Sequence, residues 1–389
     1  MRDAVIVEAV RTPIGKGKPG GSLAHVHPVE LLAHTLRTLV ERSGVDPALI
    51  DDVIGGTVDQ VGEQAMNTTR YAALSAGFPE TVPATTVDRQ CGSSQQAVHF
   101  AAQGVIAGAY DIVVACGVES MSRVPMWSNV PEGKDPFGPG VAARYEEGLV
   151  PQGISAELIA AKWSIGREQM DAFAVSSHRK AAAAWEKGLL DAEVAPLEGL
   201  SRDECVRPGS TPEILAGLKP AYYDPTFAER FPQIEWNVTA GNASPINDGA
   251  SAVLIMSGET AERLGLRPLA RLHSFAVTGS DPILMLTGVI PATEQVLRRA
   301  HLTLDDIDLF EVNEAFSSVV LAWQQETGAD PAKVNVHGGA IAIGHPLGAS
   351  GTRLTTTLVH AMRERGARYA LQTMCEAGGL ANAMVLERV

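Results

Sequence analysis

Two stretches far apart in the chain share one pattern: DDVIGGTVDQ, residues 51–60, and DDIDLFEVNE, residues 305–314. Each begins with an acidic turn and continues as a short apolar run of strand character. The spacing that follows is also shared, because Cys91 comes 39 positions after Asp52 and His345 comes 39 positions after Asp306. A repeat of this kind predicts a chain built from two similar halves.

The segments after Cys91 and His345 correspond as well. Small residues come first, as GSSQQ and PLGASG, and each half then runs through a helix into a strand, DIVVACGVES in one and ARYALQTMCEAGG in the other. Alternating strands and helices indicate α/β halves with mainly parallel sheets. We therefore expect Cys91 and His345 to lie at equivalent helix N-termini that face each other.

Cys91 lies directly before a predicted helix. Apolar residues recur on one face of that helix, namely Ala97, Val98, Ala101, Ala102, Val105 and Ile106. No Asp or Glu occupies its first turn, so the unpaired N–H groups and the macrodipole should favour a thiolate at Cys91. The stretch leaves open the alternative of a buried, unreactive cysteine.

Residues 120–246 differ in kind from the two halves. They hold 12 of the 23 prolines and four of the five tryptophans, and their clearest helix is predicted around EQMDAFAVSSHRKAAAAWEKG. Long irregular insertions on α/β scaffolds commonly carry binding sites. An oligomer contact or a structural lid would be an alternative use of the same segment.

Composition excludes several classes of protein. The four cysteines of the 389 residues are scattered without a CxxC pair, which argues against a disulfide framework or a zinc site and favours a cytoplasmic location. The N-terminus predicts a strand rather than a signal peptide, and no segment is apolar enough to span a membrane. The net charge of −14 argues against nonspecific nucleic-acid binding.

Three motifs mark the C-terminal half. NEAF, residues 313–316, places an amide and a carboxylate at a strand end. The run NVHGGAIAIGHPLGASGTR, residues 335–353, surrounds His345 with glycines, which indicates close backbone approach. MCEAGGLANAM, residues 374–384, puts Cys375 at a strand end before a glycine turn.

Together these motifs resemble those of the thiolases, which are acetyl-CoA acyltransferases. CGSSQQA resembles the nucleophile motif, NEAF and GGAIAIGHPLGASG match two others, C-x-x-G-G matches a fourth in part, and AGNASPINDGASA resembles a further segment. The resemblance implies a five-layered αβαβα fold of two similar βα halves. It implies an N-terminal half at 1–119 and 247–270, a coenzyme A-binding loop domain at 120–246 and a C-terminal half at 271–389. It also implies a homo-oligomer, a dimer or a tetramer.

The resemblance further implies the roles of single residues. Cys91 would be the nucleophile, His345 its general base, Cys375 the group that moves the proton at Cα, and Asn313 the holder of a water in an oxyanion hole. A second oxyanion hole would use the backbone N–H groups of Cys91 and Ala377, where the common pattern has glycine. The residues expected to contact coenzyme A or substrate are Ser244, Arg207, Gln152, Tyr222, Ala315, Phe316 and Met285.

The expected reaction is the coenzyme A-dependent cleavage of 3-ketoacyl-CoA to acetyl-CoA and a shortened acyl-CoA, as in fatty acid β-oxidation. Coenzyme A would be a co-substrate, with no permanently bound cofactor and no metal. A β-ketoacyl synthase-like condensing enzyme is one alternative, and Cys375 and NEAF argue against it. A noncatalytic acyl or lipid carrier would not need all four polar centres together, and a cysteine hydrolase would leave Cys375 unexplained. The segments DRQCGSSQQA and LQTMCEAGGLAN resemble those of degradative thiolases of actinobacterial type, some of which act on steroid side chains.

Overall fold

The N-terminal half of the chain forms one part of a large sheet. The computed structural model describes residues 2–389, and the strand order in this half is β4-β3-β5-β6-β1, with β2 paired to β6. The bounds are β1 (Ala4–Arg11), β2 (Gly15–Lys16), β3 (Asp52–Gly56), β4 (Ala84–Val87), β5 (Ile112–Ser120) and β6 (Asn247–Ser257). Strands β5 and β6 are buried along their whole length, which explains their nearly continuous apolar sequences.

The C-terminal half repeats this order as β7-β10-β9-β8. The bounds are β7 (Ala270–Gly279), β8 (Leu309–Val312), β9 (Tyr369–Glu376) and β10 (Leu380–Glu387). A single parallel bridge between Phe310 and Val334 stands where the first half has β4. The two parts join where Val5 and Ile6 pair with Arg271 and Ala270.

The expectation of mainly parallel sheets is wrong, because the sheet is mixed. Among the strands of residues 2–389, only β3 with β4, β3 with β5, and β8 with β9 run parallel. Strands β9 and β10 are joined by the short turn 377–379, which permits only antiparallel pairing. Strand β6 returns from the long insertion antiparallel to both β1 and β5.

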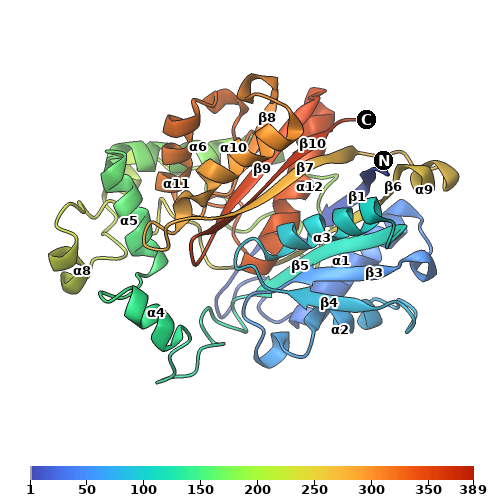
Figure 1. Ribbon diagram of the computed structural model, residues 1–389, viewed down its shortest axis with the longest axis horizontal. Helices are drawn as coiled ribbons and strands as arrows, with labels where there is room; N and C mark the ends of the chain where they lie inside the picture. The colour runs from blue at the N-terminus through green and yellow to red at the C-terminus, as the bar shows by residue number, and fades with distance from the viewer. Residues whose placement is uncertain (1) are drawn as a thin grey trace.

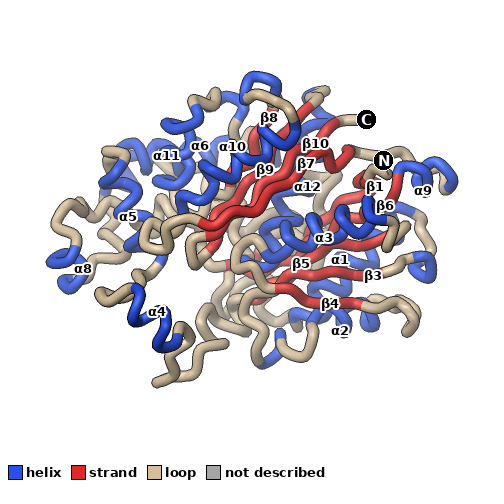
Figure 2. The backbone as a smooth tube through the Cα atoms, in the orientation of Figure 1, coloured by secondary structure: helices blue, strands red, loops and turns tan. Residues whose placement is uncertain are grey.

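The helices complete five layers, as predicted. Figures 1 and 2 show α3 and α12 between the two parts of the sheet, with the remaining core helices on the outer faces. Buried side chains of α1 and α2 pack on the outer face of the N-terminal part, and those of α10 and α11 pack on the outer face of the C-terminal part. Those of α3 and α12 pack against both parts. The bounds are α1 (Pro28–Ser43), α2 (Thr68–Ser75), α3 (Ser93–Ala107), α9 (Gly258–Arg263), α10 (Val289–Ala300), α11 (Ser317–Thr327) and α12 (Ser350–Arg365).

The segment between β5 and β6 is helical and irregular. It contains α4 (Gly138–Arg144), α5 (Gln152–Lys162), α6 (Arg167–Glu186), α7 (Pro212–Ala216) and α8 (Pro225–Arg230), and α4, α5 and α8 extend to one end of the molecule in Figure 1. The fully buried Arg11 of β1 anchors this segment, since its guanidinium bonds the carboxylates of Glu193 (2.6 Å) and Asp203 (2.7 Å). The helix predicted around residues 168–188 is α6. Across residues 2–389, no helix is both long and apolar enough to cross a membrane.

Short 3-10 turns connect several of these elements. They are η1 (Pro47–Leu49), η2 (Gly62–Gln64), η3 (Leu286–Gly288), η4 (Leu304–Asp306), η5 (Pro331–Lys333) and η6 (Leu347–Ala349). Turn η6 leads directly into α12, so the residues just before it sit at the entrance of a central helix, as those before α3 do.

Candidate active site

The N-termini of the two central helices touch each other. A Cβ on Gly351 would overlap the backbone of Gln95, and the N–H of Thr352 donates to Ser94 Oγ at 3.0 Å. Cys91 lies just before α3 and packs in one small cluster with Leu347 of η6. The segments that carry Cys91 and His345 therefore converge at the centre of the molecule.

His345 is buried and held in one tautomer. Its Nδ1 lies 2.6 Å from Ser350 Oγ, and the Ser350 hydroxyl donates to the carbonyl of Pro346 at 2.8 Å. Ser350 Oγ therefore accepts from Nδ1–H, and Nε2 keeps its lone pair. Burial, with a contribution from Arg353, lowers the pKa of His345 to about 3. The imidazole is thus a neutral group whose Nε2 can accept a proton.

Asn313 lies beside this nitrogen. It follows β8 directly, it is fully buried, and its Nδ2 lies 3.5 Å from His345 Nε2. Its Oδ1 has no hydrogen-bond partner among residues 2–389. An unpaired amide oxygen in a buried site is the type of acceptor that a bound water would satisfy.

Cys91 opens into a cavity of about 210 Å³. Gln152 and Ala377 line the same cavity, whose other walls are largely apolar. The remaining lining residues are Val58, Asp59, Gln90, Met126, Trp127, Asn129, Val130, Pro136, Phe137 and Leu347. The cavity therefore combines one thiol with room for an apolar chain.

The resting Cys91 is not the thiolate that its helix position predicts. Burial raises the pKa of Cys91 to about 12, with a contribution from the carboxyl of Glu376. The first turn of α3 has no acidic residue of its own, but strand β9 supplies one from the other half of the chain. A base must remove the proton of this thiol before it can attack a substrate.

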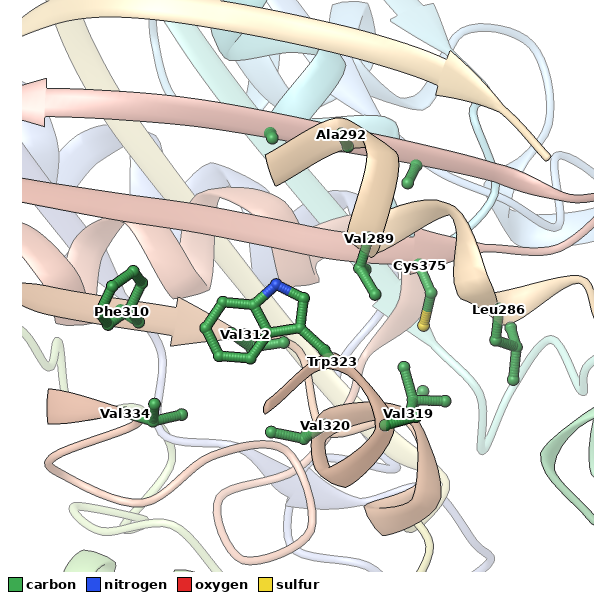
Figure 3. Close-up of a cluster of buried hydrophobic side chains, with 14 of the residues drawn as sticks. Leu286, Val289, Ala292, Phe310, Val312, Val319, Val320, Trp323, Val334 and Cys375 are labelled. Carbon is green, nitrogen blue, oxygen red and sulfur yellow. The ribbon is translucent and has the colours of Figure 1, made fainter. Parts of the chain in front are cut away.

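Cys375 lies near Cys91, at the end of β9. Figure 3 shows it beside Val289, Val319 and Leu286, at one end of the apolar cluster under α10 and α11. Burial raises its pKa well above the ordinary thiol value, and the neighbouring Cys91 adds to this rise. Two neutral thiols from different halves therefore share one site.

The turn after Cys375 tolerates an alanine. The left-handed positions of this turn are Gly378 (φ 82°) and Gly379 (φ 78°), whereas Ala377 is not among the residues with positive φ. A Cβ on Gly379 would lie 2.7 Å from the carbonyl oxygen of Ser280. Alanine at 377 therefore costs no backbone strain. The residue lines the cavity of Cys91.

Several residues expected to contact coenzyme A lie together. The N–H of Ser244 donates to the carbonyl of Ala315 at 2.9 Å, and the ring of Tyr222 packs edge-to-face on Phe316 with centroids 5.9 Å apart. The Tyr222 ring also fills the space beside Gly153, the neighbour of Gln152. These residues form a wall that runs from the Cys91 cavity into the insertion.

Met285 and Arg207, the other two residues expected to contact coenzyme A or substrate, have different surroundings. Met285 is buried in the same cluster as Phe316 and has φ +45°, and its N–H donates to the carbonyl of Asp281. Arg207 is exposed, and its backbone N–H donates to His178 Nδ1 of α6 at 3.2 Å. The contacts of Arg207 are thus with α6 rather than with the wall around Phe316.

Two buried carboxyl groups were missed by the reasoning from sequence. Glu119 accepts from the backbone N–H groups of Val58 (2.9 Å) and Gly348 (2.8 Å), so it ties the loop after β3 to the loop after His345. Glu376 lies against Gly92, the N-cap of α3. The only signal in the sequence is an acidic residue at the end of an otherwise apolar strand, in both cases.

Comparison with known proteins agrees with this geometry. Sequence profiles described as "Thiolase, N-terminal domain" and "Thiolase, C-terminal domain" match residues 4–259 and 266–388. A steroid 3-ketoacyl-CoA thiolase of Mycobacterium tuberculosis is 46% identical, over 100% of this chain and 95% of that protein. A 3-ketoacyl-CoA thiolase of Bacillus subtilis is 42% identical over the full length of both.

A solved structure shows the same architecture. The crystal structure of human mitochondrial 3-ketoacyl-CoA thiolase in complex with CoA superposes with a TM-score of 0.89 at 35% identity, covering 100% of this chain and 98% of that one. The order of motifs, the two repeated halves and these matches over the whole length lead to one conclusion. The chain belongs to the thiolase family, whose members are acyltransferases.

Proposed function

We propose that this chain cleaves 3-ketoacyl-CoA with coenzyme A, through an acyl group carried on Cys91. The observation that carries the proposal is two neighbouring pairs of groups: the thiols of Cys91 and Cys375, and the imidazole of His345 beside the amide of Asn313. The segments of Cys91 and His345 meet where Cys91 packs with Leu347. A hydrolase or a carrier has no use for the second thiol.

In the first step, His345 Nε2 takes the proton of Cys91. The Cys91 sulfur attacks the 3-keto carbon, and a C–S bond forms as the bond between C2 and C3 breaks. The electron pair of the broken bond passes to the acetyl-CoA enolate, whose oxygen lies between the protonated His345 and a water on Asn313. The Cys375 thiol protonates C2 and becomes a thiolate.

In the second step, the thiol of a new coenzyme A gives up its proton to the Cys375 thiolate. Its sulfur then attacks the acyl thioester on Cys91. The negative charge on the tetrahedral intermediate would be held by the backbone N–H groups of Cys91 and Ala377, two residues that line the cavity. Collapse of this intermediate breaks the bond to Cys91, the Cys91 thiolate takes back the proton held by His345, and the shortened acyl-CoA is released.

We infer that the loop domain, residues 120–246, holds coenzyme A. Tyr222 and Ser244 of this segment contact Phe316 and Ala315 of the NEAF motif, and Met285 lies in the same cluster as Phe316. Gln152 lines the cavity of Cys91. Arg207 offers an exposed positive charge on the same segment for the phosphates of coenzyme A. No permanently bound cofactor or metal takes part in this proposal.

The walls of the cavity suggest the class of acyl chain. Met126, Trp127 and Phe137 line it and are partly exposed, at 38%, 57% and 56%. Exposed large apolar side chains beside a cavity favour an extended apolar ligand. Together with the steroid thiolase of Mycobacterium tuberculosis, this favours a long or ring-bearing 3-ketoacyl chain.

We also propose a homo-oligomer, a dimer or a tetramer, in the cytoplasm. Strand β4 is an edge strand. Three large apolar side chains are exposed: Met66 in the loop before α2, Tyr71 on α2 and Phe100 on α3. Exposed edges and apolar groups of this kind are usually covered by a partner. Light scattering after size-exclusion chromatography measures the state, and a monomer at micromolar concentration would contradict it.

A cleavage assay tests the proposed function. Purified protein is given coenzyme A and 3-ketoacyl-CoA esters of short, medium and ring-bearing chains, and the products are followed by mass spectrometry. We expect acetyl-CoA and the shortened acyl-CoA in equal amounts, formed only when coenzyme A is present. Release of a free acid would indicate a hydrolase, and no turnover with any ester would indicate a carrier.

A further inference from the structure

Glu376 lies under the first turn of α3, next to the residue that follows Cys91. It is the last residue of β9 and is fully buried. A Cβ on Gly92 would overlap the Glu376 carboxyl group. Gly92 is the N-cap of α3, so the carboxyl occupies the space that any side chain at this cap would need.

One oxygen of this carboxyl is held and the other is not. With its amide oriented to satisfy both ends, Asn382 of β10 donates to Glu376 Oε1 at 3.2 Å and accepts from the N–H of Gln96 at 3.2 Å. Glu376 Oε2 has no hydrogen-bond partner among residues 2–389. The acid is therefore fixed in position, but only one of its oxygens is hydrogen-bonded. A buried carboxylate with an unpaired oxygen is destabilised in its charged form.

The charged and titratable groups around Cys91 and Glu376 come from three parts of the chain. They are Asp88 and Arg89 from the loop before α3, Glu119 from β5, and Cys375 from β9. Arg89 is the only cation of this set, and Nε of its guanidinium has no hydrogen-bond partner among residues 2–389. One local cation and the positive end of α3 can balance about one negative charge, not two.

We propose that Glu376 is a positioning residue that acts on Cys91: the two groups share a single negative charge, so Glu376 keeps Cys91 a thiol until His345 removes its proton in the presence of substrate. The nucleophilic role of Cys91 rests on the proposed function. Burial of the carboxyl raises the pKa of Glu376 well above its ordinary value, while Arg89 opposes this rise and Asp88 adds to it.

This arrangement keeps Cys91 unreactive in the substrate-free enzyme and lets it react when substrate is bound. A thiolate that is permanently present at the end of a cavity would react with any electrophile or oxidant that enters. A thiol that is held neutral by its neighbour reacts only when a base and a substrate are both in place. Glu376 thus gives the resting site protection, and His345 gives it activity.

The experiment measures the alkylation of Cys91 by iodoacetamide between pH 6 and 11 in the substrate-free enzyme. Because the pKa of Cys91 is about 12 in the wild type, its midpoint is obtained by fitting the rising part of the profile. Labelling of each cysteine is followed by peptide mass spectrometry, with the fully buried Cys116 as the internal reference. Glu376→Gln keeps the shape of the acid and removes its charge. We expect the midpoint of the Cys91 profile to fall by at least one pH unit, which is about tenfold more thiolate below the midpoint. Because a weaker base is a weaker nucleophile, the labelling rate at fixed pH should rise about threefold.

Two further variants make the result specific. Glu376→Asp keeps the acid but withdraws it from Gly92 by one methylene, so its midpoint should lie between those of the wild type and Glu376→Gln. Glu157→Gln removes a different buried carboxylate, which bonds the backbone of Asn237 and Val238, and should leave the midpoint of Cys91 unchanged.

Equal midpoints in the wild type and in Glu376→Gln would overturn the proposal. If Glu376→Gln does not fold, Glu376→Asp decides in the same way, since a midpoint equal to that of the wild type contradicts the charge sharing. The measurement needs no substrate. A shifted midpoint in an enzyme that cleaves no 3-ketoacyl-CoA would therefore contradict the proposed function and leave the coupling in place.

Discussion

At the scale of single residues, the reactive groups are neutral at rest. Burial raises the pKa of Cys91 to about 12 and lowers that of His345 to about 3. Transfer of the proton from the thiol to the imidazole in the empty site would create two buried charges at a high cost. Substrate binding must lower this cost, so we expect proton transfer and attack on the carbonyl to occur together.

Replacing Cys91 by serine should abolish acyl transfer. A serine alkoxide forms far less readily than a thiolate with the same base, and here the base has a low proton affinity. Intact-protein mass spectrometry after incubation with a 3-ketoacyl-CoA should show an acyl adduct in the wild type and none in Cys91→Ser. An adduct that persists in Cys91→Ser, or that maps to another residue, would contradict the assignment of the nucleophile.

Replacing Cys375 by alanine should separate two activities. If Cys375 only moves the proton at Cα, Cys375→Ala still accepts an acyl group from a simple acyl-CoA onto Cys91. Carbon–carbon cleavage should fall by about 10²-fold to 10⁴-fold, the usual contribution of a positioned acid or base. Deuterium uptake from D₂O into the methyl group of acetyl-CoA measures the proton step directly. Undiminished uptake in Cys375→Ala would assign that step to His345 or to a water.

Single residues also show what could be learned from the sequence. The residues brought together at the site, Cys91, His345, Asn313 and Cys375, were named from motifs, and their chemical roles stay predictions. Glu376 could not be found in this way. Its effect on Cys91 depends on a contact between two halves that are far apart in the chain, and no local pattern encodes such a contact.

At the scale of elements, the helices were predicted better than the pairing of strands. The apolar face of α3 is local information. Five of its six predicted residues, Ala97, Val98, Ala101, Ala102 and Val105, are fully buried, and Ile106 is partly buried. The direction of a strand depends on the connection that precedes it. The short turn 377–379 and the long insertion before β6 both give antiparallel pairs, which alternation of strands and helices does not reveal.

The contact between the two central helices gives a prediction for Gly351→Ala. The new Cβ would overlap the backbone of Gln95, and neither helix can move without disturbing the layers around it. We expect a loss of about 1–3 kcal/mol in the free energy of unfolding, typical of overpacking, with a clear loss of turnover. Urea unfolding followed by circular dichroism and the cleavage assay measure the two effects.

Gly209→Ala is the matched control. A Cβ at this position would meet nothing within 4 Å, and its φ is not positive. This variant should keep both the stability and the turnover of the wild type. A Gly351→Ala protein as stable and as active as Gly209→Ala would show that the helix contact can relax.

At the scale of the whole molecule, buried histidines lower the free energy of unfolding at acidic pH. Burial, with a contribution from Arg89, lowers the pKa of His99 to about 3, and both of its ring nitrogens lack partners among residues 2–389. The unfolded chain protonates this group near pH 6.5. Its contribution to stability is complete above pH 6.5 and is lost as the pH falls toward 3.

His99→Leu should therefore flatten the acid limb of the stability curve. At pH 5 the cost of keeping His99 neutral is about 2 kcal/mol, and leucine does not carry it. The free energy of unfolding should fall less between pH 8 and pH 5 in the variant than in the wild type, by about this amount. Denaturant unfolding at both pH values and at one protein concentration measures the difference. Parallel curves for the two proteins would contradict the assignment.

The architecture of the molecule could be predicted because it is repeated. The spacing that recurs after Asp52 and Asp306 indicated two halves, the family motifs indicated five layers, and both predictions are confirmed. The boundaries of the loop domain stay a prediction. Their exact positions depend on packing against both halves, for example of Arg11 against Glu193 and Asp203, and such contacts have no period in the sequence.

The position of β6 between β5 and β1 has a consequence for protein synthesis. Strands β1, β3, β4 and β5 leave the ribosome early, but β6, which joins β1 to the rest of the N-terminal sheet, follows only after the whole insertion has been made. Until then β1 and β5 each present an unpaired, apolar edge, the kind of surface that invites aggregation. The nascent chain must therefore be shielded through most of its translation, and a fragment that stops at residue 246 would contain every motif of the nucleophile and yet be unable to close the sheet that supports it.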